Sequence, residues 1–252
     1  MSAIPITLGL QLLLDARAIT ELNDGDSVAS WADSSGNFNN ASQATAANRP
    51  IYKTNIFGAN PAVRHADSSD FVSGSFAGWS GGTGATFFLA ASNLPSSNTA
   101  SGRYFTIAPT GGVDASNYLL GVASSFEFWV GGSNRVTTVP LASAGVGVPI
   151  IFGGAVDSSN IATILNGSWR TPTHSFSLPS ATQNQYATGF INGTPTAGFS
   201  CLADYHFLIA YNRRLSTSEI SQVCQWIREE LGIDTATGGG KPTNPFTQGV
   251  IG

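Results

Sequence analysis

Short apolar runs separated by turn residues dominate this chain. The runs are rich in Val, Ile, Phe, Tyr and Thr, and clusters of Gly, Asn, Ser and Pro bound them, which is the pattern of β-strands joined by tight turns. They lie at 8–14, 62–65, 86–91, 103–108, 118–122, 126–130, 148–156 and 161–165. No run approaches the length of a membrane span. The pattern predicts one all-β domain.

The pair Asn166-Gly167 gives the sharpest local signal. It lies between the run 161–165 and the segment Ser168-Trp169-Arg170. Both central residues of a type I′ turn need a positive φ, which Asn and Gly adopt most readily. The sequence therefore predicts a β-hairpin here.

One segment has the period of a helix instead. Ser216 and Glu219 form a capping-box pattern, and Gly232 is a suitable C-terminal stop. Between them, Ile220, Val223, Cys224, Ile227 and Leu231 fall on one helical face. We predict an amphipathic helix over about 216–231 that packs on the β domain, whereas Trp226 lies off its main apolar face.

The chain is poor in charge. Charged residues make up 10%, against about 25% in an average soluble domain. The 11 Lys and Arg are outnumbered by 15 Asp and Glu, so we expect no nucleic-acid partner. Their place is taken by 30 Ser, 23 Thr, 17 Asn and 29 Gly. Such residues suit the turns and open faces of a β protein.

Two stretches resemble a known family. One runs from Leu12-Leu13-Leu14-Asp15-Ala16 through Trp31-Ala32-Asp33-Ser34-Ser35-Gly36-Asn37 to Asn60-Pro61-Ala62-Val63-Arg64. The other is Ile209-Ala210-Tyr211-Asn212-Arg213-Arg214-Leu215-Ser216, which leads into the predicted helix. Together they resemble the concanavalin A-like, laminin-G-like jelly-roll domains of phage virion and bacterial surface proteins. The resemblance covers about residues 8–232. It implies a two-sheet antiparallel sandwich, a fold that hosts lectins, enzymes and structural modules alike.

The composition changes after the predicted helix. We assign residues 1–234 to the sandwich domain and residues 235–252, rich in Gly and Pro, to a C-terminal arm. The arm carries three apolar anchors, Phe246, Val250 and Ile251. We expect them to dock on the parent domain, on a neighbouring copy or on another protein.

Aromatic residues and one acid are the candidate ligand contacts. Trp79 precedes Ser80-Gly81-Gly82, where we expect an exposed indole that stacks on a sugar ring or on a partner. Glu127 and Trp129 lie in one strand-like run. For Glu127 the sequence favours a solvent-facing strand residue over a catalytic one. Trp129, Trp169 and Tyr104 lie in strand-like runs and are expected in the core rather than at a ligand, and Trp31 is expected to be a core anchor.

Catalytic patterns are missing. Glycoside hydrolysis needs two carboxylates about 5 to 9.5 Å apart, and Glu127 stands alone in sequence. His65, His174 and His206 lack metal-ligand spacing. Asp204 and His206 are expected to form a surface pair, and Cys201 and Cys224 two buried thiols. We expect no enzyme.

Calcium is the metal that the sequence suits best. Asp24, Asp26, Asp33, Asn37 and Asn39 offer hard oxygen ligands in two loops. The same residues are common in turns, where the side chains bond their own backbone. The sequence favours this turn chemistry over a bound ion and implies no other cofactor.

These observations give a first functional hypothesis, a non-enzymatic virion component such as a phage capsid-decoration, fibre or tail protein. Its partners would be other virion proteins or copies of itself, and surface glycans as a possible addition. The start of the sequence shows no secretory signal. We therefore expect the protein in a virion, made in the host cytoplasm, or otherwise on an extracellular surface, with no membrane partner. The alternative is a carbohydrate-binding module; a glycoside hydrolase or polysaccharide lyase ranks last.

Overall fold

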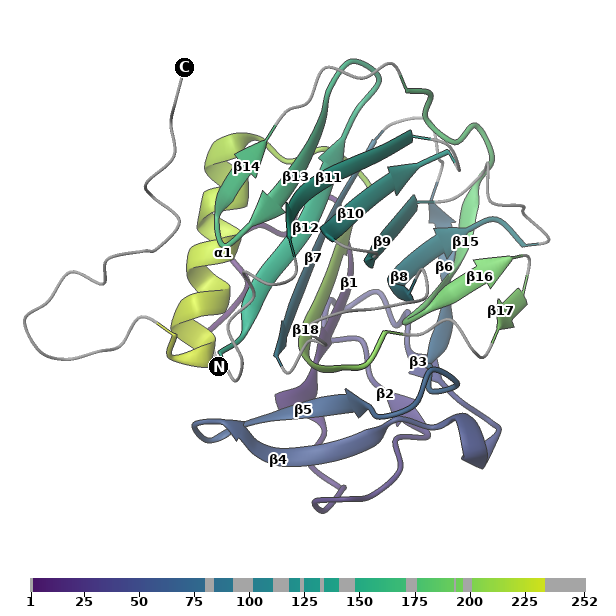
Figure 1. Cartoon of the computed structure of the whole chain (residues 1–252), viewed down its shortest axis with the longest axis vertical. Helices are drawn as coiled ribbons and strands as arrows, with labels where there is room; N and C mark the ends of the chain where they lie inside the picture. Colours follow the sequence, from purple (N-terminus) through teal and green to yellow (C-terminus); the bar gives the residue numbers. More distant parts are fainter. Residues whose placement is uncertain are drawn as a thin grey trace, which may run out of the picture.

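The structure is a computed structural model of the chain (Figure 1). It describes residues 2–79, 84–92, 102–110, 118–122, 125–131, 134–140, 148–170, 176–192, 194–196 and 201–233. Only the backbone is described at 78, 122, 125, 134–140, 170, 190–192 and 194–196. The predicted arm, 235–252, with Phe246, Val250 and Ile251, lies outside the described residues.

Two antiparallel sheets of eight strands each make up the fold. The first sheet has the order β14 (Ser168–Arg170), β13 (Ile161–Leu165), β12 (Ile150–Val156), β7 (Ala85–Ser92), β18 (Ala203–Tyr211), β5 (Asn60–His65) and β4 (Ile51–Phe57), and β1 (Leu10–Asp15) also pairs with β18. The second has the order β11 (Asn134–Pro140), β10 (Ser125–Val130), β9 (Tyr118–Val122), β8 (Gly102–Ala108), β15 (Gln183–Ala187), β6 (Ser73–Trp79), β3 (Ala41–Ser42) and β2 (Ser30–Trp31). A separate ribbon pairs β16 (Phe190–Asn192) with β17 (Thr194–Thr196).

The predicted fold class is confirmed. The sheets face one another as a jelly-roll sandwich, and one helix follows, α1 (Thr217–Leu231). Two 3₁₀ turns, η1 (Ala16–Ala18) and η2 (Ala46–Asn48), complete the described elements. The hairpin at Asn166-Gly167 is also as predicted, with positive φ at both residues, 49° and 85°. No helix among the described residues is long and apolar enough to cross a membrane.

Aromatic rings fill the space between the two sheets. Phe87 from the first sheet contacts Phe105, Tyr118 and Phe128 from the second at centroid distances of 5.7, 5.7 and 5.9 Å. Trp31 is fully buried in the same cluster, as predicted. The sheets approach so closely at Gly154 that a Cβ there would lie 2.3 Å from Cγ of Phe128. Only glycine fits at this point of the strand.

A second apolar layer lies on the outer face of the first sheet. Helix α1 covers this face (Figure 1) and packs its buried residues on β7, β12 and β18. The capping box is present: the Ser216 side chain accepts from the backbone N–H of Glu219, whose carboxylate accepts from the N–H of Ser216. Gly232 ends the helix at φ 71°. Strands β7, β12 and β18 are consequently buried on both faces, which explains their largely apolar sequences.

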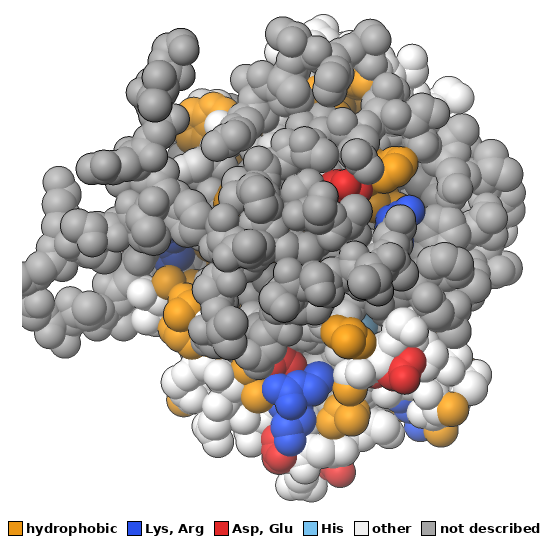
Figure 2. Space-filling view, viewed as in Figure 1, with side chains coloured by type: hydrophobic (Ala, Val, Ile, Leu, Met, Phe, Trp, Pro, Cys, Tyr) orange, Lys and Arg blue, Asp and Glu red, His pale blue; other side chains and the backbone are white. Residues whose placement is uncertain are grey.

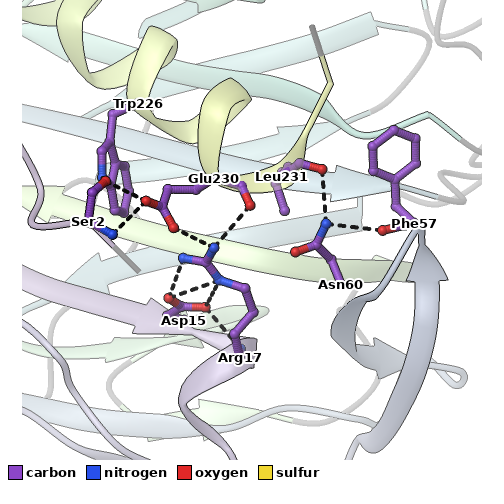
Figure 3. Close-up of polar contacts among 8 residues, drawn as sticks. All are labelled: Ser2, Asp15, Arg17, Phe57, Asn60, Trp226, Glu230 and Leu231. Carbon is purple, nitrogen blue, oxygen red and sulfur yellow. Dashed lines mark hydrogen bonds and ion pairs between the residues drawn. The ribbon is translucent and has the colours of Figure 1, made fainter. Parts of the chain in front are cut away.

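Arg17 links this helix to the sandwich (Figure 3). Its guanidinium forms an ion pair with Asp15 at 2.8 Å and with Glu230 of α1 at 2.6 Å. It also donates to the main-chain carbonyl of Glu230 and lies over the ring of Phe207, 4.6 Å from its centroid. The Asp15 residue is fully buried, so the ion pair is screened from water.

The N-terminal segment adds to the same contact. The backbone N–H of Ser2 donates to the Glu230 carboxylate at 2.7 Å, and Nε1 of Trp226 donates to the Ser2 hydroxyl at 3.0 Å. Trp226 is buried and packs 5.2 Å from Phe207. Its position off the main apolar stripe of α1 does not expose it, because the chain start covers that flank of the helix.

Replacing Arg17 tests how much this ion pair contributes to the free energy of unfolding. Arg17→Met keeps the aliphatic length but leaves the buried Asp15 carboxylate without its cation, so the free energy of unfolding should fall by about 3 kcal/mol. The control is Lys53→Met, which removes the cation of an exposed pair with Asp24. The control should leave urea unfolding almost unchanged. Equal effects of the two substitutions would contradict the assignment.

Candidate functional site

Three side chains converge on the outer face of the second sheet. Glu127 on β10 lies opposite Gly121 on β9, which lies opposite Arg103 on β8. Side chains alternate along a strand, so Phe126 and Phe128 enter the core while Glu127 and Trp129 point the other way. We call Arg103, Glu127 and Trp129 the Trp129 site. Figure 2 shows acidic, basic and hydrophobic side chains beside one another over this part of the sheet.

The Trp129 indole is held by charged groups. Its Nε1 donates to a carboxylate oxygen of Glu127 at 2.9 Å, and the Arg103 guanidinium carbon lies 5.3 Å from a ring centroid of the indole. Gly121, on the strand between them, has no side chain to separate Arg103 from the residues of β10. A Cβ there would lie 3.5 Å from Cδ of Arg103. Glu127 is 2% exposed, whereas Trp129 and Arg103 are half-buried. The acid bonds to the indole, and both Trp129 and Arg103 are more exposed than the acid.

The structure thus brings together two of the predicted ligand contacts. Glu127 and Trp129 are bonded to one another, and the expectation of a solvent-facing Glu127 is wrong because the residue is buried. Arg103 was not among the predicted residues. Its alternation with the buried Tyr104 places it on the outer face, but the order β8–β9–β10 that puts it beside Trp129 is not readable from local sequence.

Trp79 is a correction. We expected an exposed indole in a Gly-rich loop, but β6 extends through Trp79 and turns its side chain into the core. The residue is fully buried, 5.1 Å from Phe76 and 6.3 Å from Tyr118 between ring centroids. Strand β6 ends at Trp79. A sugar cannot stack on this side chain in the folded protein.

The most exposed tryptophan among the described residues is Trp169. The expectation that it belongs to the core is wrong: it lies on the edge strand β14 and is 43% exposed. Tyr104, from the same group of expectations, is fully buried. Trp169 is exposed because β14 is an edge strand, whereas Tyr104 lies on β8, inside its sheet; this strand order cannot be deduced from local sequence.

The first candidate calcium loop is occupied by its own contacts. The Asp24 carboxylate pairs with Lys53 and accepts from the backbone N–H of Thr54 at 2.9 Å. The Lys53 contact, with the Thr54 bond, holds the pKa of Asp24 below its usual value. Asp26 accepts from the backbone N–H of Asn23 at 2.7 Å. The Asp26 bond is a turn contact of the kind that the sequence favoured, whereas Asp24 is bonded to residues of strand β4.

The second loop behaves in the same way. One Asp33 oxygen accepts from the N–H groups of Leu13 and Ser35, both at 2.9 Å, and the other from the Ser35 hydroxyl at 2.7 Å and the Asn39 N–H at 3.0 Å. Asn37 donates to the carbonyl of Leu10 at 2.9 Å. Among the described residues, no three His, Cys, Asp or Glu side chains are grouped so that they could hold a metal ion.

Chelation tests the calcium expectation. Because the carboxylates of both loops are bonded to the chain itself, adding EDTA to the purified protein should leave the melting temperature unchanged. Adding calcium afterwards should also have no effect. A fall in melting temperature with EDTA that calcium restores would instead establish a bound ion.

Asp204 and His206 form no surface pair. Both are buried, and a bulge between Tyr205 and Phe207 interrupts the register of β18 with β7. The Asp204 carboxylate takes two bonds from Arg64, at 2.6 and 2.8 Å. His206 Nδ1 lies 2.9 Å from the carbonyl of Pro61 and Nε2 lies 2.9 Å from the Ser92 hydroxyl. A carbonyl can only accept, so Nδ1 carries the proton and Nε2 accepts.

Both described cysteines are buried and free, as expected. Burial raises the pKa of Cys224 to about 12, which makes its thiol unreactive. Cys201 lies in the apolar cluster between the sheets.

His65 is buried without a hydrogen bond at either ring nitrogen. Its ring lies against Tyr205 at a centroid distance of 4.4 Å. Burial lowers the pKa of His65 from 6.5 to about 3, although the Asp70 backbone and the Asp204 charge act in the opposite direction. The imidazole is therefore neutral in the folded protein.

This residue should make stability depend on pH. Between pH 6.5 and 3 the unfolded chain protonates His65 and the folded chain does not, so acid favours unfolding. From pH 7 to pH 5 the wild type should lose about 2 kcal/mol more of its free energy of unfolding than His65→Phe. Urea titrations at both pH values measure the difference. Parallel losses in the two proteins would contradict the burial of a neutral imidazole.

Comparison with known proteins gives the fold but no family. The sequence matches no family model and no curated protein. Among solved structures, the Trypanosoma rangeli sialidase matches at TM-score 0.57 and 14% identity, over 91% of this chain and 34% of that one. The botulinum neurotoxin serotype D ligand binding domain, in complex with N-acetylneuraminic acid, matches at 0.57 and 11%, over 88% and 52%.

A smaller protein matches along its whole length. Domain 4 of AbnA, a GH43 extracellular arabinanase from Geobacillus stearothermophilus, in complex with arabinotriose, gives TM-score 0.52 and 13% identity, over 81% of this chain and 100% of that domain. The chain spans about a third to a half of the first two structures. At these identities the likeness shows the fold alone, a β-sandwich.

Proposed function

We propose that this chain is a non-catalytic carbohydrate-binding sandwich, with the Trp129 site as its sugar contact. The observation that carries the proposal is the fixed, half-exposed indole of Trp129, bonded below to Glu127 and flanked by Arg103. A sugar ring presents a C–H face to an aromatic ring and hydroxyls around its rim. The Trp129 indole offers a flat surface for the C–H face, and Arg103 and Glu127 offer charged groups for the hydroxyls.

Preorganisation supports this assignment. The Glu127 bond fixes the orientation of the indole before any ligand arrives, so less side-chain freedom is lost on binding. Arg103 brings donors in a planar fork that can bridge neighbouring hydroxyls. Two of the similar structures contain sugars according to their names, N-acetylneuraminic acid and arabinotriose, which supports a sugar ligand for the shared fold.

Hydrolysis does not suit the site. A glycosidase places two carboxylates across the scissile bond. Glu127 is the one carboxylate among the three residues of the Trp129 site, and one of its oxygens is engaged by the indole N–H. We therefore propose binding without turnover.

The virion setting stays a prediction from the sequence. The segment expected to dock in an assembly, with Phe246, Val250 and Ile251, lies outside the described residues. A carbohydrate-binding virion protein and a carbohydrate-binding module of a surface protein would share the Trp129 site. Co-sedimentation of the protein with assembled particles, against a truncation at residue 234, separates the two settings.

Substitution of Trp129 tests the sugar contact. On an array of neutral and acidic oligosaccharides, Trp129→Ala should weaken binding about tenfold or more, because a central aromatic contact is lost. Trp129→Phe keeps a ring but loses the bond to Glu127, so its affinity should lie between those of the wild type and Trp129→Ala. The matched control is Trp169→Ala, an exposed tryptophan on the other sheet, which should bind as the wild type does. Loss with Trp169→Ala alone would contradict the proposed site.

A further inference from the structure

Phe38 is the most exposed large hydrophobic residue among the described ones. Its side chain is 84% exposed, in the loop between β2 and β3. Its backbone has φ 59°, in the left-handed region that bulky residues seldom adopt. Glycine or asparagine would suit this conformation better. Neither backbone preference nor burial in the core therefore accounts for an aromatic residue at this position.

The loop that carries Phe38 is tied to the domain on both sides of it. Before it, Asn37 donates to the carbonyl of Leu10 at 2.9 Å. After it, Asn39 donates to the carbonyl of Gln11 at 2.7 Å, and its own carbonyl accepts from the buried hydroxyl of Tyr186 at 2.5 Å. The ring is thus presented from a fixed backbone rather than from a loose loop.

The carboxylate of Asp33 completes this frame. It accepts four hydrogen bonds from the loop and from β1, which occupy both of its oxygens. The other exposed residues of the loop are uncharged: Ser34, Gly36, Asn37 and Asn40. A ligand at this loop meets an apolar ring on a segment whose other exposed groups are neutral. That chemistry matches a neutral sugar rather than a charged ligand.

The small area of the exposed Phe38 ring also favours a sugar over a protein partner. A stable protein interface buries about 800 Å² on each partner, far more than one phenyl ring offers. One sugar ring, by contrast, is covered by one aromatic side chain. The Phe38 loop also lies apart from the Trp129 site: β3 is five strands from β10 in the second sheet, about 24 Å at about 4.8 Å per strand.

We propose that the Phe38 loop (residues 33–40) is a second carbohydrate contact, specific for neutral sugars and separate from the Trp129 site. The proposal rests on the proposed carbohydrate-binding function. Two contacts on one sheet would let a polysaccharide, or two neighbouring chains of a glycan surface, bind more tightly than either contact alone.

The substitution Phe38→Gly separates binding from folding. Glycine adopts a positive φ without strain, so the melting temperature should stay equal or rise. On the same array of neutral and acidic oligosaccharides, binding to neutral glycans should weaken about tenfold. The matched control is Leu8→Ala, which removes a side chain that is 74% exposed, and it should leave binding unchanged. Trp129→Ala is measured in parallel.

Each outcome decides one question. Weaker binding of neutral glycans by Phe38→Gly, with melting temperature retained, supports the second contact, whatever Trp129→Ala does. Unchanged binding by Phe38→Gly with loss in Trp129→Ala overturns the second contact and keeps the proposed function. A lower melting temperature in Phe38→Gly, or a changed sedimentation coefficient, overturns the inference in favour of a structural or self-association role. Absence of wild-type binding to every glycan overturns both proposals.

Discussion

The burial of β18 on both faces is the constraint on which the rest of the structure depends. All nine of its residues are buried, with one face in the core between the sheets and the other under α1. A strand in this position can carry polar side chains only if each finds a partner. The Asp204 carboxylate therefore accepts two hydrogen bonds from the Arg64 guanidinium, and the His206 ring lies between the Ser92 hydroxyl and the carbonyl of Pro61. These contacts fix β5 and β7 on either side of it.

The same strand determines how the chain ends are assembled. β5 pairs with the first residues of β18 and β1 with the last ones, so one edge of β18 serves two partners. The helix that follows β18 must return across the outer face of the sheet, where Arg17 joins it to Asp15 at the end of β1. Helix α1 covers the outer face of the first sheet, whereas Trp129 is half-buried on the outer face of the second sheet.

Much of the fold could be predicted from local sequence, because local physics determines it. The Asn166-Gly167 turn and the Ser216 capping box depend on a few neighbouring residues, and both are present. Exposure of single aromatic residues depends on strand order and strand ends, which local sequence does not contain. Trp79 was consequently expected to be exposed but is buried, and Trp169 was expected in the core but is exposed. The bond between Glu127 and Trp129 could likewise not be predicted without the strand order.

The scarcity of charge can now be related to the candidate contacts. Among the described residues, the buried carboxylate of Asp204 pairs with Arg64 of the neighbouring strand β5, and that of Asp15 pairs with Arg17, which also reaches Glu230 of α1. The exposed residues of the Phe38 loop are uncharged. Arg103 and Glu127 differ from both groups because they contact the half-buried indole of Trp129. A protein that binds neutral sugars needs few charges, placed where they orient an aromatic ring. The low charge content, from which we expect no nucleic-acid partner, also fits the proposed binding of neutral sugars.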